Sequence, residues 1–64
     1  MFRYPKTNVH ARLDGSIIEV AYRFDGDVYR FTDRAQAERQ VRILAGGAAD
    51  DDTIRRFIDA VIAS

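Results

Sequence analysis

The sequence contains no cysteine and no tryptophan, only one proline and one histidine, and its ten basic residues are balanced by ten acidic ones. Without cysteine there is no disulfide, and one histidine is too few for the usual structural zinc site, so the common staples of small domains are absent. The zero net charge removes the simplest indication of nucleic-acid binding, a strongly basic chain. Stability must therefore come from the core, from well-formed turns and helix ends, or from a partner.

Long apolar runs are also missing from the chain. No run approaches the roughly 20 residues of a membrane-spanning helix, and the first residues lack the apolar core of a signal peptide. These absences, together with the lack of cysteine, predict a cytoplasmic protein with no membrane partner. A hydrophobic fraction of 47 % is normal for a folded chain. We expect one small domain over 1–64, with 1–6 as a candidate flexible N-terminal arm.

Two Asp-Gly pairs predict β-hairpins. Asp14-Gly15 and Asp25-Gly26 each lie between runs rich in aliphatic and aromatic residues, and Asp-Gly is favoured in two-residue type I′ turns. The expected strands are Thr7–Leu13, Ser16–Phe24 and Asp27–Phe31. Turns at these positions would pair Leu13 with Ser16, Ala11 with Ile18, Phe24 with Asp27, and Tyr22 with Tyr29.

Side-chain alternation then separates an apolar face from a mixed face, and both hairpins agree on which face is apolar. The apolar face is expected to carry Val9, Ala11, Leu13, Ile18, Val20, Tyr22, Phe24, Tyr29 and Phe31. The mixed outer face is expected to carry His10, Arg12, Ile17, Glu19, Ala21, Arg23, Val28 and Arg30.

The second half of the chain predicts two helices. Thr32 or Asp33 is a suitable cap for a helix that ends near Ala45, before Gly46-Gly47. Asp50–Asp52 opens a second helix, from about 52 to 63, since carboxylates favour a helix N-terminus. The buried stripes are expected to be Ala37, Val41, Leu44 and Ala45, then Ile54, Phe57, Ile58, Val61 and Ile62. The predicted fold is α+β: a three-stranded antiparallel meander with two α-helices packed on one face (β-β-β-α-α), in two layers.

The residues that catalysis or metal binding would need are scarce. Ser16 lies too far along the sheet to be a nucleophile for His10, which in the predicted register faces Glu19 as an ordinary surface pair. The carboxylates of Asp50–Asp52 suit helix capping better than a Mg²⁺ or Ca²⁺ site, because consecutive residues point in different directions. Gly46-Gly47 lacks the lysine of a phosphate-binding loop. We expect no enzyme, no catalytic residue, no cofactor and no metal.

The outer face of the sheet is the main candidate surface. Arg12, Arg23, Arg30 and His10 would project from it, and the alternation would add Phe2 and Tyr4 if it continued through Pro5. Arginines beside aromatic rings suit a protein partner or nucleic acid, although the same residues also make an ordinary solvated sheet face. A homodimer would instead centre on Ile17, Ala21 and Val28.

At the level of architecture, three strands followed by a helix that opens Thr32-Asp33-Arg34-Ala35-Gln36-Ala37 resemble the arm-type DNA-binding domains of phage integrases. That resemblance implies that the outer sheet face would enter the DNA major groove. Our leading hypothesis is a small non-enzymatic protein that acts through protein–protein interaction. Its size is similar to that of phage or mobile-element inhibitors of host machinery, such as anti-CRISPR proteins. The alternatives are a nucleic-acid-binding domain and a homodimeric accessory protein.

Overall fold

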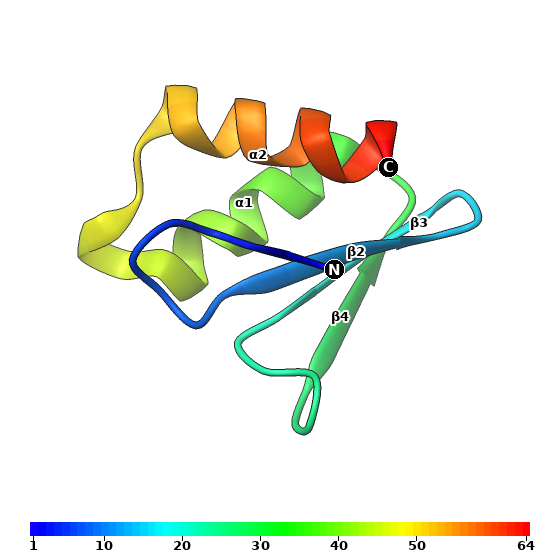
Figure 1. The fold of residues 1–64 in the computed structure, drawn as a ribbon, viewed down its shortest axis with the longest axis horizontal. Coiled ribbons are helices and arrows are strands. Elements are labelled where there is room, and N and C mark those ends of the chain that lie inside the picture. Colours follow the sequence, from blue (N-terminus) through cyan, green and yellow to red (C-terminus); the bar gives the residue numbers. More distant parts are fainter.

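The computed structural model describes residues 1–64 and shows a sheet covered on one face by two helices (Figure 1). The elements in chain order are β1 (Phe2–Arg3), β2 (His10–Asp14), β3 (Ile17–Ala21), β4 (Val28–Phe31), α1 (Arg34–Ala45), the 3-10 turn η1 (Gly46–Ala48) and α2 (Asp51–Ala63). All neighbouring strands are antiparallel, in the order β1-β2-β3-β4. The predicted α+β class and the two helices are confirmed, but the sheet has four strands and not three.

The additional strand, β1, comes from the segment expected as an N-terminal arm. Phe2 lies opposite Ala11 and Arg3 lies opposite His10. The Tyr4 N–H donates to the Val9 carbonyl at 2.8 Å, which continues the pairing beyond β1. A strand of two residues shows no alternation that a sequence pattern could reveal, and Pro5 obscures it further.

The turn of the first hairpin lies one residue later than predicted, which shifts the strand register by two residues. Asp14 pairs with Ile17, so the turn residues are Gly15 and Ser16, and Leu13 lies opposite Ile18 and not Ser16. Gly15 has φ +62° while Ser16 does not have a positive φ, which is the pattern of a type II′ turn with glycine first. The strand register differs by two residues, and because side chains alternate with period two, the assignment of faces is unchanged.

The second hairpin is also shifted by two residues, because its connection is longer. Ala21 pairs with Val28, Val20 with Tyr29, and residues 22–27 form a loop in which the Gly26 N–H donates to the Arg23 carbonyl at 3.2 Å. The predicted two-residue turn at Asp25-Gly26 is therefore wrong. Three aromatic residues predicted in the core lie outside it as a result: Tyr22 is half exposed, Phe24 packs under the Arg12 guanidinium, and Tyr29 is partly exposed.

The core lies between the sheet and the two helices. Its buried members are Tyr4, Val9, Ala11, Ile18, Val20, Ala37, Val41, Ile54, Phe57, Ile58 and Val61. Val20 and Phe57 are buried as predicted, whereas Ile62 is exposed. The rings of Tyr4 and Phe57 meet edge to face, with centroids 5.5 Å apart. None of the helices is long and apolar enough to cross a membrane.

Asp33, one of the two predicted caps, caps the start of α1, and α2 begins at Asp51, one residue before its predicted start. The Asp33 side chain accepts from the Ala35 N–H at 3.0 Å, and the Asp50 side chain accepts from the Thr53 N–H at 2.9 Å. Gly46 ends α1 with φ +57°, a conformation that glycine adopts without strain. The helix boundaries that had local capping signals are therefore the best-predicted part of the chain.

Candidate functional site

The outer face of the sheet is organised around one buried carboxylate. Glu19 on β3 lies opposite Arg12 on β2 and Arg30 on β4, and it is only 5 % exposed. The Arg12 Nε donates to Glu19 Oε1 at 2.6 Å, and the Arg30 Nε lies 3.5 Å from Oε2. The Arg12 guanidinium also lies 4.1 Å from the centre of the Phe24 ring. These contacts hold both arginine side chains along the sheet surface, because the Glu19 carboxylate pairs with each of them.

The other two polar residues predicted on this face are placed differently. His10 lies opposite Ala21 and not Glu19, and its Nδ1 is 2.7 Å from the Asn8 carbonyl oxygen. The predicted pairing of His10 with Glu19 is therefore wrong by the same two-residue register difference. Arg23 is exposed in the 22–27 loop and does not belong to the paired part of the sheet.

Phe2 and Tyr4 do not lie on the outer face, which corrects their predicted placement. Phe2 is opposite Ala11 and packs against the core, while Tyr4 is 1 % exposed. The Tyr4 hydroxyl accepts from the Asp50 N–H at 3.1 Å. The expected alternation fails because the chain turns back on itself between β1 and β2. Arg3, opposite His10, is the side chain that β1 adds to the outer face.

The residues proposed for a homodimer, Ile17, Ala21 and Val28, do not form an exposed apolar patch. Ala21 is completely buried and pairs with Val28 at one end of the strands, whereas Ile17 pairs with Asp14 at the other end. Glu19 lies between Ala21 and Ile17 along β3. A dimer centred on these three residues would thus have to cover the buried carboxylate and its arginines.

The acidic residues at the start of α2 are all engaged within the chain. Asp50 caps the helix, Asp51 pairs with Arg42, and Asp52 pairs with Arg55 and Arg56. No group of three or more His, Cys, Asp or Glu side chains is placed to hold a metal ion.

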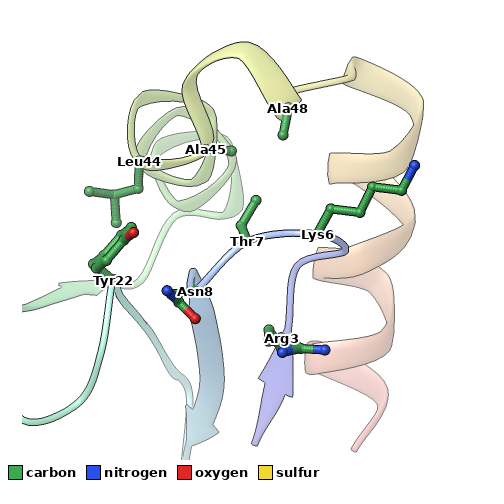
Figure 2. A pocket seen from close by; sticks show the side chains of 8 residues that line it. All are labelled: Arg3, Lys6, Thr7, Asn8, Tyr22, Leu44, Ala45 and Ala48. Atoms are coloured by element: carbon green, nitrogen blue, oxygen red, sulfur yellow. The ribbon is translucent and has the colours of Figure 1, made fainter.

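Two adjoining grooves lie at the junction of α1 with the loops of the sheet. The first has a volume of about 470 Å³ and is lined by Arg3, Lys6, Thr7, Asn8, Tyr22, Leu44, Ala45 and Ala48 (Figure 2). The second has a volume of about 340 Å³ and is lined by Tyr22, Arg23, Asp25, Gly26, Asp27, Tyr29 and Leu44. Because Tyr22 and Leu44 line both, we treat the two grooves together as the Tyr22–Leu44 surface.

The first groove has an apolar side and a cationic side. Figure 2 shows Tyr22 and Leu44 on one side and Arg3 and Lys6 on the other, with Asn8 between them. The Thr7 hydroxyl is already committed, since it donates to the Tyr4 carbonyl and accepts from the Val9 N–H. The other polar residues that line the groove are Arg3, Lys6, Asn8 and Tyr22, and the Lys6 ammonium extends away from Tyr22 and Leu44 (Figure 2).

The second groove has the opposite charge. Asp25 and Asp27 line it together with Arg23, and none of these three takes part in a salt bridge. Tyr22 and Tyr29 are 50 % and 39 % exposed, so the surface offers aromatic area between a cationic groove and a largely acidic one.

Sequence patterns did not point to this surface. Tyr22 and Leu44 were both predicted to be buried, and the surface joins residues from 3 to 48 of the chain through loops whose lengths were not predicted. The one available signal is the run of polar residues from Lys6 to Asn8 at the start of a predicted strand. Comparison with models of known protein families, with curated proteins and with solved structures gives no match to this chain.

Proposed function

We propose that the chain is a small non-enzymatic binding protein that docks on another protein through the Tyr22–Leu44 surface. The observation that carries the proposal is the pair of adjoining grooves that share Tyr22 and Leu44. Tyrosine is enriched in protein interfaces because it combines a large apolar ring with a hydrogen-bonding hydroxyl. Flanking charges of both signs would orient a protein partner and disfavour wrong ones.

The ion pairs of the outer face support a protein partner over nucleic acid. A phosphate that bound Arg12 would compete with Glu19, whose oxygen lies 2.6 Å from the Arg12 Nε. Displacing either arginine would leave a largely buried carboxylate with fewer partners, which costs free energy. Two of the arginines on which nucleic-acid binding was expected to depend are thus neutralised within the sheet.

A protein that docks without catalysing a reaction acts by occupying a surface of its partner. An inhibitory role of the kind expected from the sequence, against host machinery, is therefore part of this proposal. It would require the Tyr22–Leu44 surface to cover a region that the partner uses for its own substrate or subunit.

Photo-crosslinking from the surface tests the proposal. Tyr22 is replaced by p-benzoylphenylalanine and irradiated in a lysate of the organism that encodes the chain, with Ile62, exposed on α2 to 42 %, as the matched control position. We expect a discrete adduct from position 22 that protease removes and nuclease leaves intact. An excess of wild-type protein should abolish the adduct, whereas an excess of Tyr22→Ala should not.

Two results would contradict the docking function. Equal adduct yields from positions 22 and 62 would show that crosslinking reflects exposure alone. Adducts that nuclease removes would favour the nucleic-acid alternative.

A further inference from the structure

Of the ten basic side chains, four make no ion pair within the chain: Arg3, Lys6, Arg23 and Arg39. Two of these four, Arg3 and Lys6, line the first groove, and no aspartate or glutamate lines it. The first groove therefore brings together two of the four unpaired basic residues with no acidic residue beside them. An anionic group is the natural complement.

The opposite side of the same groove is apolar. Leu44 and Tyr22 line the side of the groove opposite Arg3 and Lys6 (Figure 2). A ligand that filled the groove would need an anionic group and an apolar group side by side. Inorganic phosphate supplies only the first of these, whereas a peptide with a carboxylate next to an aromatic or aliphatic side chain supplies both.

The backbone that carries the two cations is held in place. Arg3 is paired with His10 in the sheet, and the intervening Tyr4 is anchored in the core. Lys6 is the only non-glycine residue with a positive φ, +62°, and the turn around it is closed by the Thr7 hydroxyl, 2.8 Å from the Tyr4 carbonyl oxygen. A left-handed lysine is an uncommon conformation that the surrounding contacts impose. A fixed backbone reduces the entropy lost when a ligand binds.

We infer that the first groove binds an acidic segment of the protein partner, with a side-chain carboxylate near Arg3 and Lys6 and a neighbouring apolar side chain against Tyr22 and Leu44. This inference rests on the proposed docking function and names the chemistry of the segment that docks. A second copy of the chain is a poorer complement. Its acidic loop carries Arg23 between Tyr22 and Asp25, and Arg23 would meet the two cations.

Short blocked peptides probe the groove directly. We would titrate ¹⁵N-labelled protein at low salt with acetyl-Glu-Phe-Glu-amide and follow the backbone amides by NMR. The matched peptides are Gln-Phe-Gln, which removes the charge, and Glu-Gly-Glu, which removes the apolar group. We expect Glu-Phe-Glu to shift the amides of Lys6, Asn8, Tyr22 and Ala45, and to bind about tenfold more tightly than Gln-Phe-Gln. Glu-Gly-Glu should also bind more weakly, and added salt should weaken Glu-Phe-Glu most.

Protein variants locate the binding on the groove. The double variant Arg3→Gln/Lys6→Gln should lose about tenfold in affinity for Glu-Phe-Glu, and Tyr22→Ala should lose affinity without any change in charge. Arg39→Gln is the control, because Arg39 is exposed and unpaired on α1 but lines neither groove. It should bind as the wild type does. Circular dichroism shows whether the double variant folds. If it does not, the single variant Lys6→Gln replaces it in the peptide titration.

Four results would overturn the inference. Two concern affinity: Gln-Phe-Gln or inorganic phosphate binds as tightly as Glu-Phe-Glu. Two concern location: the peptide shifts amides outside the groove, or the groove amides shift when the protein concentration alone is raised, which would place a second copy there. The crosslinking experiment remains independent of these. A protein adduct from position 22 together with an unresponsive groove would leave the docking function intact and remove only the acidic-segment assignment. Peptide binding without any protein adduct would remove the docking function.

Discussion

Glu19 is the only charged side chain that the fold buries, and its position between Arg12 and Arg30 has two consequences. It fixes the register of β3, because a slip by one residue would turn the carboxylate toward the apolar core. It also neutralises two arginines that would otherwise present a basic stripe across three strands. The same residue therefore contributes to the uniqueness of the sheet and to the choice of partner.

Removing this one charge should give the outer face an affinity for nucleic acid. Glu19→Gln keeps the shape of the side chain but removes the only counter-charge of Arg12, whereas Arg30 keeps Asp14, 3.7 Å away. We expect tighter binding to duplex DNA at low salt than the wild type shows, with a log–log salt dependence steeper by about one unit for the freed Arg12. Fluorescence anisotropy at several salt concentrations measures this. Glu38→Gln is the control, because Arg34 keeps its bond to Asp59. Unchanged DNA affinity in Glu19→Gln would show that the ion pairs do not limit this face.

At the scale of the elements, α2 depends on one buried stripe and one cap. The buried residues are Ile54, Phe57, Ile58 and Val61. The Phe57 ring contacts the ring of Tyr4, which follows β1 in the chain. Arg34 joins the helices: it donates to Asp59 at 2.7 Å and to the Arg55 carbonyl at 3.1 Å. Its bonds to Asp59 and then Glu38 raise the Arg34 pKa.

Phe57→Ala should remove enough of the core to unfold the protein. Truncation of a buried phenylalanine costs about 3–5 kcal/mol, comparable with the whole free energy of unfolding expected for a small domain. Thermal unfolding followed by circular dichroism should show no cooperative transition. Ile62→Ala, on the exposed side of the same helix, should melt as the wild type does. A cooperative melt of Phe57→Ala near the wild-type midpoint would mean that the α2 stripe does not hold the fold together.

The Asp50 cap should make stability dependent on acid pH. Hydrogen bonds from the Thr53 side chain and backbone N–H lower the Asp50 pKa below its ordinary 3.8. The stabilisation from the cap is therefore complete above pH 3.8 and is lost as the pH falls through the lowered value. Urea unfolding between pH 6 and pH 2 should show Asp50→Ala less stable than the wild type near neutrality, with the difference shrinking toward pH 2. Asp25→Ala, which removes an unpaired carboxylate, should not reproduce this convergence.

The elements differ in how well the sequence predicts them, and the reason is the range of the interactions that define them. Asp33, Asp50 and Gly46 act within four residues, so the helix ends follow from local patterns. The hairpin registers depend on turn geometry, and a glycine-first turn at Gly15 or a longer loop shifts them by two residues without exchanging the faces. The Tyr22–Leu44 surface depends on how several loops are placed relative to one another, and a local sequence pattern does not predict that placement.

At the scale of the whole molecule, the N-terminal residues close the fold. Tyr4 packs its ring on Phe57, and its hydroxyl accepts from the backbone N–H of Asp50, 46 residues away. The same segment pairs with β2 and carries the cations of the first groove. In a chain of 64 residues with no disulfide, such a long-range contact joins both layers and both halves of the sequence.

Deleting residues 1–5 should therefore abolish cooperative folding, which a merely attached arm would not do. The truncation leaves a void against Phe57, removes one of the two strands that pair with β2, and leaves the Asp50 N–H without its acceptor, losses that together exceed about 3 kcal/mol. Calorimetry should show no unfolding transition for the truncated chain. Met1→Ala, which changes a residue that is 75 % exposed, should leave the transition unchanged. A truncated chain that still melts cooperatively would show that residues 1–5 are not required for folding. The first groove would then lose one wall without loss of the fold.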